Sequence, residues 1–394
     1  MADIPPEQPW FTVDGNRMKL LDTGPRRLEA LIALIEGAEK SLRILFYIYT
    51  DDVAGRRVRD AMVAARARGV SVSVIVDGFG SEAAGDETFF LPLTDAGGEV
   101  CRFLPRFGRS YLLRNHQKLA LADAESGDGA RVITGGFNVE DDYFGTPAEQ
   151  AWRDLGIQIE GPAAARIAGY FDALSKWARL EKAKIRDLRR LLGRASEKVG
   201  TVRWLLGGPT RRLSPWAQTM RTDMLAAKRI DMIAAYFAPG PGLLRRMDRT
   251  GKRGGDVRLI TAAISDNTAT IAAARFTYRG LLKNGARIFE FLPTKLHTKL
   301  YVIDDIVHIG SANFDMRSLF INLEIMVRIE DAAFADHVRS YFEGEMAKSE
   351  AITAEVNRAR SGLWTRIKQF GAYLLIAVLD YNVSRRLNFG IDGR

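Results

Sequence analysis

The chain has 394 residues, of which 47% are hydrophobic and 27% are charged, and its formal net charge is +9. This composition excludes a disordered chain, and the length is sufficient for two ordinary cores or one large core. The single cysteine, Cys101, excludes an internal disulfide and a cysteine-based zinc cluster, so we expect it to be a buried structural residue.

The N-terminal stretch MADIPPEQPW has acids and prolines where an export signal needs a basic flank followed by an apolar run. Near the C-terminus the longest charge-free apolar run, residues 369–379, is much shorter than the roughly 20 residues of a bilayer-spanning helix. We therefore expect no export signal and no membrane span, which favours a cytoplasmic location.

The first half of the chain begins with the pattern of a strand, a helix start and a second strand. Residues 43–55 read RILFYIYTDDVAG and residues 65–81 read ARARGVSVSVIVDGFGS, and their apolar and β-branched runs are typical of strands. A further short strand precedes the tripeptide Phe103-Leu104-Pro105.

The stretch RNHQKLALAD then places His116, Lys118 and Asp123 in an H-x-K-x-x-x-x-D pattern within a strand-like run. Side chains two apart in a strand point the same way, so His116 and Lys118 are expected to share a face. Asp123 falls on the opposite parity, at or past the strand end, which indicates a local structural tie. Two further candidates follow: Asn138 in GGFN, and Asp154 in the strand-like run WRDLGIQIEG.

A basic segment lies between the two halves. Residues 176–198 carry nine Lys or Arg against three acids. Such an excess favours an anionic partner surface, lipid or nucleic acid, but it is equally typical of a solvated linker helix.

The second half repeats the plan of the first. Residues 229–241 and 251–267 repeat the strand and helix pattern, and Phe291-Leu292-Pro293 repeats the tripeptide. The second motif and its companions stand in the same order as in the first half, as His297, Lys299, Asp304, Asn313 and Glu324.

This internal duplication predicts an α/β fold with two similar mixed β-sheets flanked by helices. If the halves pack around a pseudo-two-fold axis, the two motifs meet at one shared active site. We divide the chain into a first half (residues 1–175), a basic linker (176–200), a second half (201–345) and a helical C-terminal tail (346–394).

The paired residues indicate phosphodiester chemistry without a metal or another cofactor. Lysines clamp phosphate oxygens but are poor neighbours for a metal cation. A neutral imidazole can attack phosphorus and an imidazolium can protonate the leaving alkoxide, so the two histidines cover both tasks through a phosphohistidine. Asn138 and Asn313 would help the lysines stabilise the transition state, while Asp154 and Glu324 would fix the histidine tautomers.

Taken together, these residues resemble the phospholipase D superfamily, whose signature is the H-x-K-x-x-x-x-D motif occurring twice. The surrounding phrases, among them YIYTDDVAG, GGFNVEDDYFG and SANFDMRSLFINLE, are most similar to the bacterial cardiolipin synthase group, in a short form without N-terminal transmembrane helices. The resemblance covers most of residues 14–330 and implies the duplicated phospholipase D-like fold.

The resemblance also implies a role for each candidate. His116 would be the nucleophile and His297 the general acid, although a nearly symmetric site can exchange these roles. The remaining matches are the phosphate-binding and supporting residues Lys118, Lys299, Asn138, Asn313, Asp154 and Glu324, and the structural aspartates Asp123 and Asp304. The glycine that often follows the motif aspartate is replaced by Ala124 and Asp305, and both changes fall in a predicted hairpin tip.

The resemblance implies a phosphatidyltransferase that makes cardiolipin from phosphatidylglycerol or a related phospholipid donor. If water replaces the acceptor lipid, the same site is a phospholipase D that releases phosphatidic acid. A nucleic-acid phosphodiesterase is a second alternative, which the positive charge permits but the lipid-type phrases do not favour. A lipid-binding scaffold without activity would not need both His-Lys pairs.

The C-terminal stretch of residues 363–389 mixes aromatic residues, an apolar run and flanking Arg and Lys. This composition suits a helix lying in a membrane interface, although a helix packed on the protein's own core is the slightly favoured alternative. With an anionic phospholipid as substrate, we expect a cytoplasmic enzyme peripheral to the inner membrane.

Overall fold

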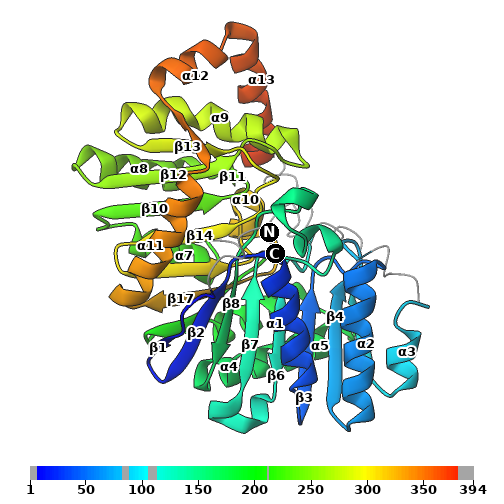
Figure 1. Cartoon of the computed structure of the whole chain (residues 1–394). Coiled ribbons are helices and arrows are strands. Elements are labelled where there is room, and N and C mark those ends of the chain that lie inside the picture. The colour runs from blue at the N-terminus through cyan, green and yellow to red at the C-terminus, as the bar shows by residue number, and fades with distance from the viewer. Residues whose placement is uncertain (1–6, 82–87, 105–112, 211–212, 380–394) are drawn as a thin grey trace.

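The computed structural model describes residues 7–81, 88–104, 113–210 and 213–379. Two eight-stranded mixed sheets form two lobes that lie against each other (Figure 1). The first sheet contains, in chain order, β1 (Phe11–Val13), β2 (Asn16–Leu21), β3 (Ser41–Phe46), β4 (Ser71–Asp77), β5 (Glu99–Phe103), β6 (Leu119–Ala122), β7 (Arg131–Gly135) and β8 (Gly156–Glu160).

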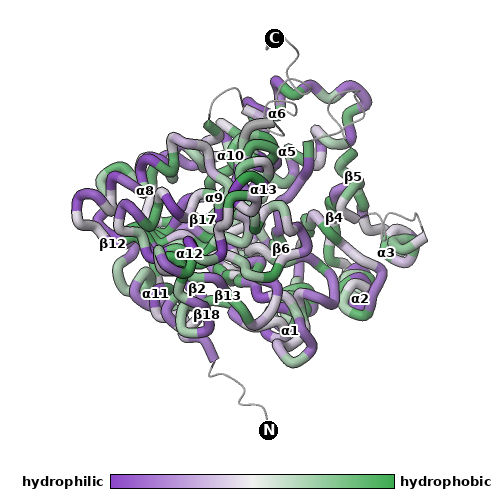
Figure 2. Tube along the Cα trace, turned by 90° about the horizontal axis from the view of Figure 1, so that it is seen from above, coloured by the Kyte–Doolittle hydropathy of each residue, from purple (hydrophilic) through white to green (hydrophobic). Residues whose placement is uncertain are grey.

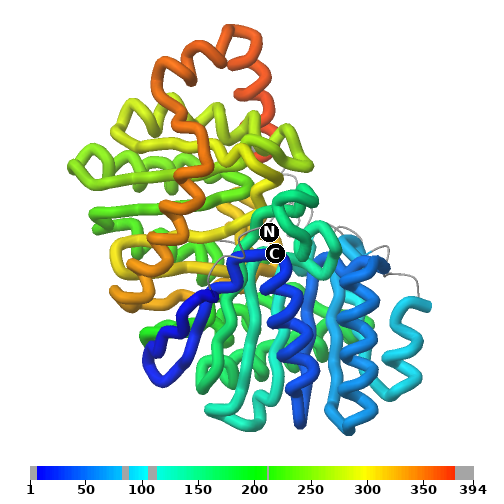
Figure 3. Tube along the Cα trace, viewed as in Figure 1, coloured from blue at the N-terminus to red at the C-terminus, as the bar shows by residue number. Residues whose placement is uncertain are grey.

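The second sheet contains β9 (Val202–Gly207), β10 (Arg229–Ala234), β12 (Asp256–Ala262), β13 (Arg287–Phe291), β14 (Lys299–Ile303), β15 (Ile306–Gly310), β17 (Glu324–Glu330) and β18 (Ser349–Ile352). The short strands β11 (Phe237–Ala238) and β16 (Phe314–Asp315) pair beside it. The colours of Figure 3 show that the chain builds the first lobe before it crosses to the second.

Five strands of each sheet follow the same order. The order β7-β6-β3-β4-β5 in the first matches β15-β14-β10-β12-β13 in the second. In both sheets, the three strands with the β-α-β pattern are parallel: β3, β4 and β5 in the first, and β10, β12 and β13 in the second. The strand after each motif histidine, β6 or β14, is antiparallel to both of its neighbours. This confirms the predicted internal duplication and its mixed sheets.

Helices cover the outer faces of both sheets and fill the space between them. On the first lobe these are α1 (Gly24–Glu36), α2 (Val53–Ala67), α3 (Leu91–Asp95), α4 (Pro162–Arg166), α5 (Ala168–Ala178) and α6 (Ile185–Ala195). On the second they are α7 (Pro215–Asp223), α8 (Pro241–Lys252), α9 (Thr268–Lys283), α10 (Met316–Phe320), α11 (Ala332–Met346), α12 (Ala354–Arg360) and α13 (Leu363–Tyr373), followed by a π-helical turn, Leu374–Leu379.

Three apolar clusters hold the fold together. One lies under α1 and α2, one lies under α7, α8 and α9, and the third runs between the lobes and joins both sheets with α5 and α11. The tube coloured by hydropathy has many apolar segments in the interior and many polar ones on the outer helices (Figure 2). Because a packed core resists sliding, the shared cluster fixes one sheet relative to the other.

One boundary differs from the division that we made from the sequence. The second sheet continues past residue 345, since β18 pairs with β13. Within the basic linker, α6 buries Leu188 and Leu192 in the shared core, while most of its basic side chains are exposed. Cys101 is buried, as predicted.

The C-terminal stretch packs on the second lobe through only part of its side chains. Tyr373 is buried and its hydroxyl donates to the carbonyl of Pro239, whereas Trp364 on the same helix is 76% exposed. Residues 380–394 of the predicted tail lie outside the described residues. None of the helices in the described part of the chain has both the length and the hydropathy to cross a bilayer.

Candidate active site

The two histidine motifs lie where the lobes meet. The backbone N–H of His116 donates to the carbonyl of Leu323 at 2.9 Å, and that of His297 donates to the carbonyl of Arg153 at 2.7 Å. Each motif is thus attached to the opposite half. For this reason the histidines precede β6 and β14, which corrects the prediction that each histidine lies within a strand.

Each histidine is paired with an acid of the other half. Nδ1 of His116 lies 3.0 Å from Oε2 of Glu324, and Nδ1 of His297 lies 2.6 Å from Oδ2 of Asp154. Both carboxyl groups are fully buried. Since Nδ1 is engaged in both rings, Nε2 is the nitrogen left for reaction.

Lys118 and Lys299 lie beside the histidines and are buried. The Lys118 ammonium donates to the carbonyl of His116 at 2.6 Å, and Lys299 makes the same contact with the carbonyl of His297. Each lysine is thus held beside the histidine of its own motif, with its amine where the two halves meet. Such groups suit an anionic substrate group.

Burial and the neighbouring ammonium groups keep both histidines neutral. Burial, followed by Lys118 and Lys299, holds the pKa of His116 well below its usual value. Burial and Lys299 lower the pKa of His297 to about 3. The charges of both lysines act on both histidines, which indicates that the two motifs form one site.

The same burial weakens the lysines as cations. It lowers the pKa of Lys118 well below its usual value, and it lowers the pKa of Lys299 to about 8 although Asp154 and Glu324 oppose the shift. A bound anion would restore the charge, because an opposite charge nearby favours the protonated amine.

The two acids have unequal surroundings. Burial alone would raise the pKa of Asp154, but Lys299 and His297 outweigh it and lower that pKa. For Glu324 burial prevails over Lys118 and raises the pKa to about 8. The Ser311 hydroxyl also donates to Glu324 at 2.5 Å. The two His–acid pairs therefore have similar geometry, but Asp154 favours its ionised form and Glu324 its neutral form.

The two predicted asparagines are buried near these pairs. The Asn138 Oδ1 accepts from the backbone N–H of Ile48 at 3.2 Å, while its Nδ2 has no hydrogen-bond partner in the described part of the chain. Asn313 differs, because its unpartnered atom is Oδ1, which accepts hydrogen bonds. A buried amide donor without a partner, here Nδ2 of Asn138, is the group expected to bind a substrate oxygen.

Aromatic side chains that the sequence did not single out surround the histidines. The Tyr47 ring centroid lies 4.9 Å from that of His116, and those of Tyr143 and Trp152 lie 5.2 and 5.3 Å from that of His297. Tyr47 and Tyr143 belong to the phrases YIYTDDVAG and GGFNVEDDYFG, which carry the family resemblance. No spacing pattern in the sequence marks these two tyrosines as site residues.

Arg27 is another residue that the sequence did not indicate. It is buried, and its guanidinium donates to the carbonyls of Asp154 at 2.5 Å and Tyr143 at 2.6 Å. A buried arginine that ties these two carbonyls together fixes the backbone behind the Asp154–His297 pair.

The two motif aspartates lie one residue past β6 and β14, away from the histidines. The Asp123 carboxylate accepts from the N–H groups of Glu39, Lys40 and Ser41 at 2.7–3.2 Å. Asp304 accepts from Lys228 and Arg229 in the same way. Both have a left-handed backbone, with φ of 54° and 47°, so each turns a hairpin while joining it to the start of a neighbouring strand.

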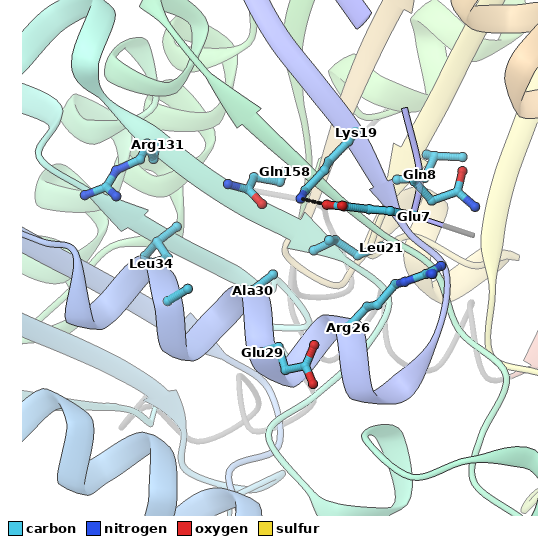
Figure 4. A pocket seen from close by; sticks show the side chains of 12 residues that line it. Glu7, Gln8, Lys19, Leu21, Arg26, Glu29, Ala30, Leu34, Arg131 and Gln158 are labelled. Carbon is cyan, nitrogen blue, oxygen red and sulfur yellow. Dashed lines mark hydrogen bonds and ion pairs between the residues drawn. The ribbon is translucent and has the colours of Figure 1, made fainter. Parts of the chain in front are cut away.

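A separate groove of about 520 Å³ lies between α1 and the strands β2 and β8 (Figure 4). Its cations are paired, as shown by Lys19 with Glu7, Arg26 with Asp22 and Arg131 with Asp123. The groove contains no histidine and does not offer phosphodiester chemistry.

A family model described as "Cardiolipin synthase, PLD-like domain" matches residues 31–175 and 223–346. Cardiolipin synthase A of Pseudomonas entomophila (strain L48) is 31% identical over 351 residues, which cover 87% of this chain and 71% of that protein. Cardiolipin synthase 1 of Bacillus cereus is 30% identical over 355 residues, 86% of this chain and 68% of that protein.

Solved structures share the fold at low sequence identity. The phosphatidylserine synthase of Haemophilus influenzae matches with a TM-score of 0.70 at 14% identity, over 94% of this chain and 97% of that one. The polyphosphate kinase of Porphyromonas gingivalis matches with a TM-score of 0.55 at 14% identity, over 87% of this chain and 49% of that one.

A duplicated fold that brings two H-x-K-x-x-x-x-D motifs to one place is the arrangement of phospholipase D-type enzymes. The chain belongs to the cardiolipin synthase family of proteins with a phospholipase D-like domain. Its enzyme class is that of phospholipase D-type phosphatidyltransferases.

Proposed function

We propose that this enzyme makes cardiolipin by transferring a phosphatidyl group from one phosphatidylglycerol to a hydroxyl group of a second. The observation that carries the proposal is the pair of crossed contacts, His116 with Glu324 and His297 with Asp154. These contacts leave two Nε2 atoms available at one site, and that is what a two-step transfer needs.

In the first step, Nε2 of His116 attacks phosphorus and the bond from phosphorus to the glycerol oxygen breaks. His297 gives its proton to that oxygen, and glycerol leaves. The phosphate anion of the bound substrate raises the pKa of His297 from its low value in the free enzyme, which allows it to hold this proton. The nucleophile stays neutral because it is the partner of Glu324, the acid with the raised pKa.

In the second step, a hydroxyl of the acceptor lipid attacks the phosphohistidine and gives its proton to His297. The bond between phosphorus and nitrogen breaks, so both histidines return to their starting state. The charge on the phosphate oxygens is stabilised in both steps by four side chains, Lys118, Lys299, Asn138 and Asn313. If water takes the acceptor's place, phosphatidic acid is released instead.

The site must reach lipids in a bilayer, and we therefore place the enzyme at the membrane surface as a peripheral protein. Exposed apolar side chains on α13, such as Trp364 at 76% and Leu363 at 75% exposed, support this location. An exposed apolar helix face flanked by basic residues is typical of interfacial helices.

The test is mass spectrometry of lipids after purified enzyme is mixed with phosphatidylglycerol vesicles, with His116→Ala as the control. Cardiolipin and free glycerol in equal amounts, both absent with the variant, are expected. Phosphatidic acid alone would reassign the enzyme as a hydrolase. Unchanged lipid would refute the proposal, and DNA degraded in a parallel reaction would move the function to nucleic acid.

A further inference from the structure

A second groove, of about 530 Å³, lies between α9, α12 and α13 at the far end of the second lobe. It is lined by five basic side chains, Arg275, Arg279, Lys283, Arg358 and Arg366, and by no acidic one. In Figure 1, α12 and α13 lie over α9 at the end of this lobe that is remote from the first.

The charge of this groove is largely uncompensated. Arg275 is bound to Glu290 at 2.7 Å. The other four basic side chains make no ion pair with any acid of the described residues. Glu355 acts on Arg358 from a longer distance, without an ion pair. The remaining like charges repel one another, so an anionic ligand in the groove would be favoured.

The groove adjoins an apolar surface on α13. Trp364 and Ile367 flank Arg366 in sequence and are 76% and 51% exposed. Leu363 and Phe370, one helical turn to either side, are also exposed. Phe370 contacts Phe276 of α9 with ring centroids 5.4 Å apart, which anchors α13 along the groove. Basic and apolar side chains thus alternate along one exposed helix.

This groove is separate from the catalytic site. Asp266, just before α9, accepts from Tyr236 at 2.6 Å, and the Tyr236 ring lies 6.5 Å from that of His297. Arg279 lies 11 residues after Thr268, the start of α9. At 1.5 Å per residue this corresponds to roughly 17 Å along the helix. A phosphate bound beside Arg279 therefore cannot be the one that reacts.

We propose that this groove binds the headgroup of an anionic phospholipid in the bilayer while the apolar face of α13 enters the interface. A soluble phosphate would use the cations but not the apolar face. A bilayer uses both, through its negative surface and its acyl region. The inference rests on the proposed function only in that the enzyme meets its substrate at a membrane.

The test is vesicle flotation with anionic phosphatidylglycerol vesicles and neutral phosphatidylcholine vesicles, in the His116→Ala background so that no lipid is consumed. The groove variant changes Arg279, Lys283, Arg358 and Arg366 to Gln. The control changes Lys40, Arg57, Arg221 and Lys228, exposed residues outside both the groove and the basic linker, to Gln and so alters the net charge equally. Thermal melts confirm that both are folded.

Each basic residue near an anionic surface contributes about fivefold to binding, so we expect the groove variant to lose at least about tenfold and the control much less. A Trp364→Ser, Ile367→Ser variant should also bind anionic vesicles less well. Equal losses in groove variant and control would overturn the inference. So would displacement by inorganic phosphate beyond that caused by sodium chloride of equal ionic strength, since it would identify a site for a soluble anion.

Activity separates this inference from the proposed function. With His116 restored, the groove variant should retain transfer on short-chain phosphatidylglycerol in detergent within about twofold, because the reaction there needs no bilayer. An enzyme that binds anionic vesicles through the groove but makes no cardiolipin would refute the proposed function alone. An active enzyme whose groove variant binds vesicles normally would refute the groove alone.

Discussion

His116 and Glu324 are 208 residues apart in the chain, and yet Nδ1 of the one lies 3.0 Å from Oε2 of the other. The reciprocal contact joins His297 to Asp154 across 143 residues. Each half thus supplies the acid that supports the other half's histidine. In the mechanism that we propose, neither half holds a complete catalytic set, so the contact between the lobes is itself part of the site.

The crossed pairing predicts which substitution affects which histidine. Glu324→Gln should alter the Nδ1 signal of His116 in nitrogen NMR and leave that of His297 in place, and Asp154→Asn should do the opposite. Asp154→Asn should also lower kcat by roughly 10²- to 10⁴-fold, since the tautomer of His297 is no longer fixed by a carboxylate. Glu324→Gln should lower kcat less, because the pKa of Glu324 is raised to about 8 and Gln resembles its neutral form. A Glu324→Gln protein in which only His297 responds would show that the pairing is wrong.

The pKa directions predict the pH dependence of kcat/KM. Both imidazoles are neutral well below pH 6.5 in the free enzyme, so the acid limb should lie below that value. The basic limb should begin near pH 8, where Lys299 loses its proton and the positive charge that binds phosphate. In kcat this limb should move to higher pH, because the bound phosphate raises the pKa of the lysine. A kcat/KM that is constant up to pH 10 would contradict this account.

Gly136 offers a steric test of the site. A Cβ atom at this position would lie 2.4 Å from Oδ1 of Asp154. Gly136→Ala should therefore displace the carboxylate from His297 and lower kcat by at least about tenfold. Gly169, in α5, has open space around it, and Gly169→Ala is the matched control with unchanged activity. Full activity of Gly136→Ala would mean that Asp154 does not need its observed position.

Asp123 should contribute to stability and not to chemistry. Burial alone would raise its pKa, but the N–H groups of Lys40, Ser41 and Glu39 outweigh it and lower that pKa. An acid with a lowered pKa stabilises the fold above its unfolded value, near 3.8, and loses this contribution as the pH falls through the folded value.

Asp123→Ala should therefore cost about 1–3 kcal/mol at pH 7, and the difference from the wild type should shrink below about pH 4. Urea unfolding at both pH values measures this difference. The specific activity of the folded variant should be unchanged at low temperature. Loss of activity without loss of stability would assign Asp123 to the catalytic machinery instead.

The sequence predicted the duplication, the mixed sheets and the residues of both motifs, because these features repeat at fixed local spacings. It did not predict that Glu324 serves His116, since that depends on how two distant segments pack. The same holds for Arg27 and Tyr47, which have no spacing rule and reach the site only through the folded core. We predicted that the strands at the two motifs include the histidines, but the strands begin after them. At His116 and His297 a backbone hydrogen bond to the other half replaces hydrogen bonding within the sheet.

The most direct test of the two-step transfer is its stereochemistry at phosphorus. Phosphatidylglycerol made chiral at phosphorus with oxygen isotopes would be converted by the enzyme, and the configuration of the cardiolipin product would be determined. Two successive displacements through a phosphohistidine predict net retention of configuration. Inversion would require a single direct displacement and would contradict the covalent role proposed for His116.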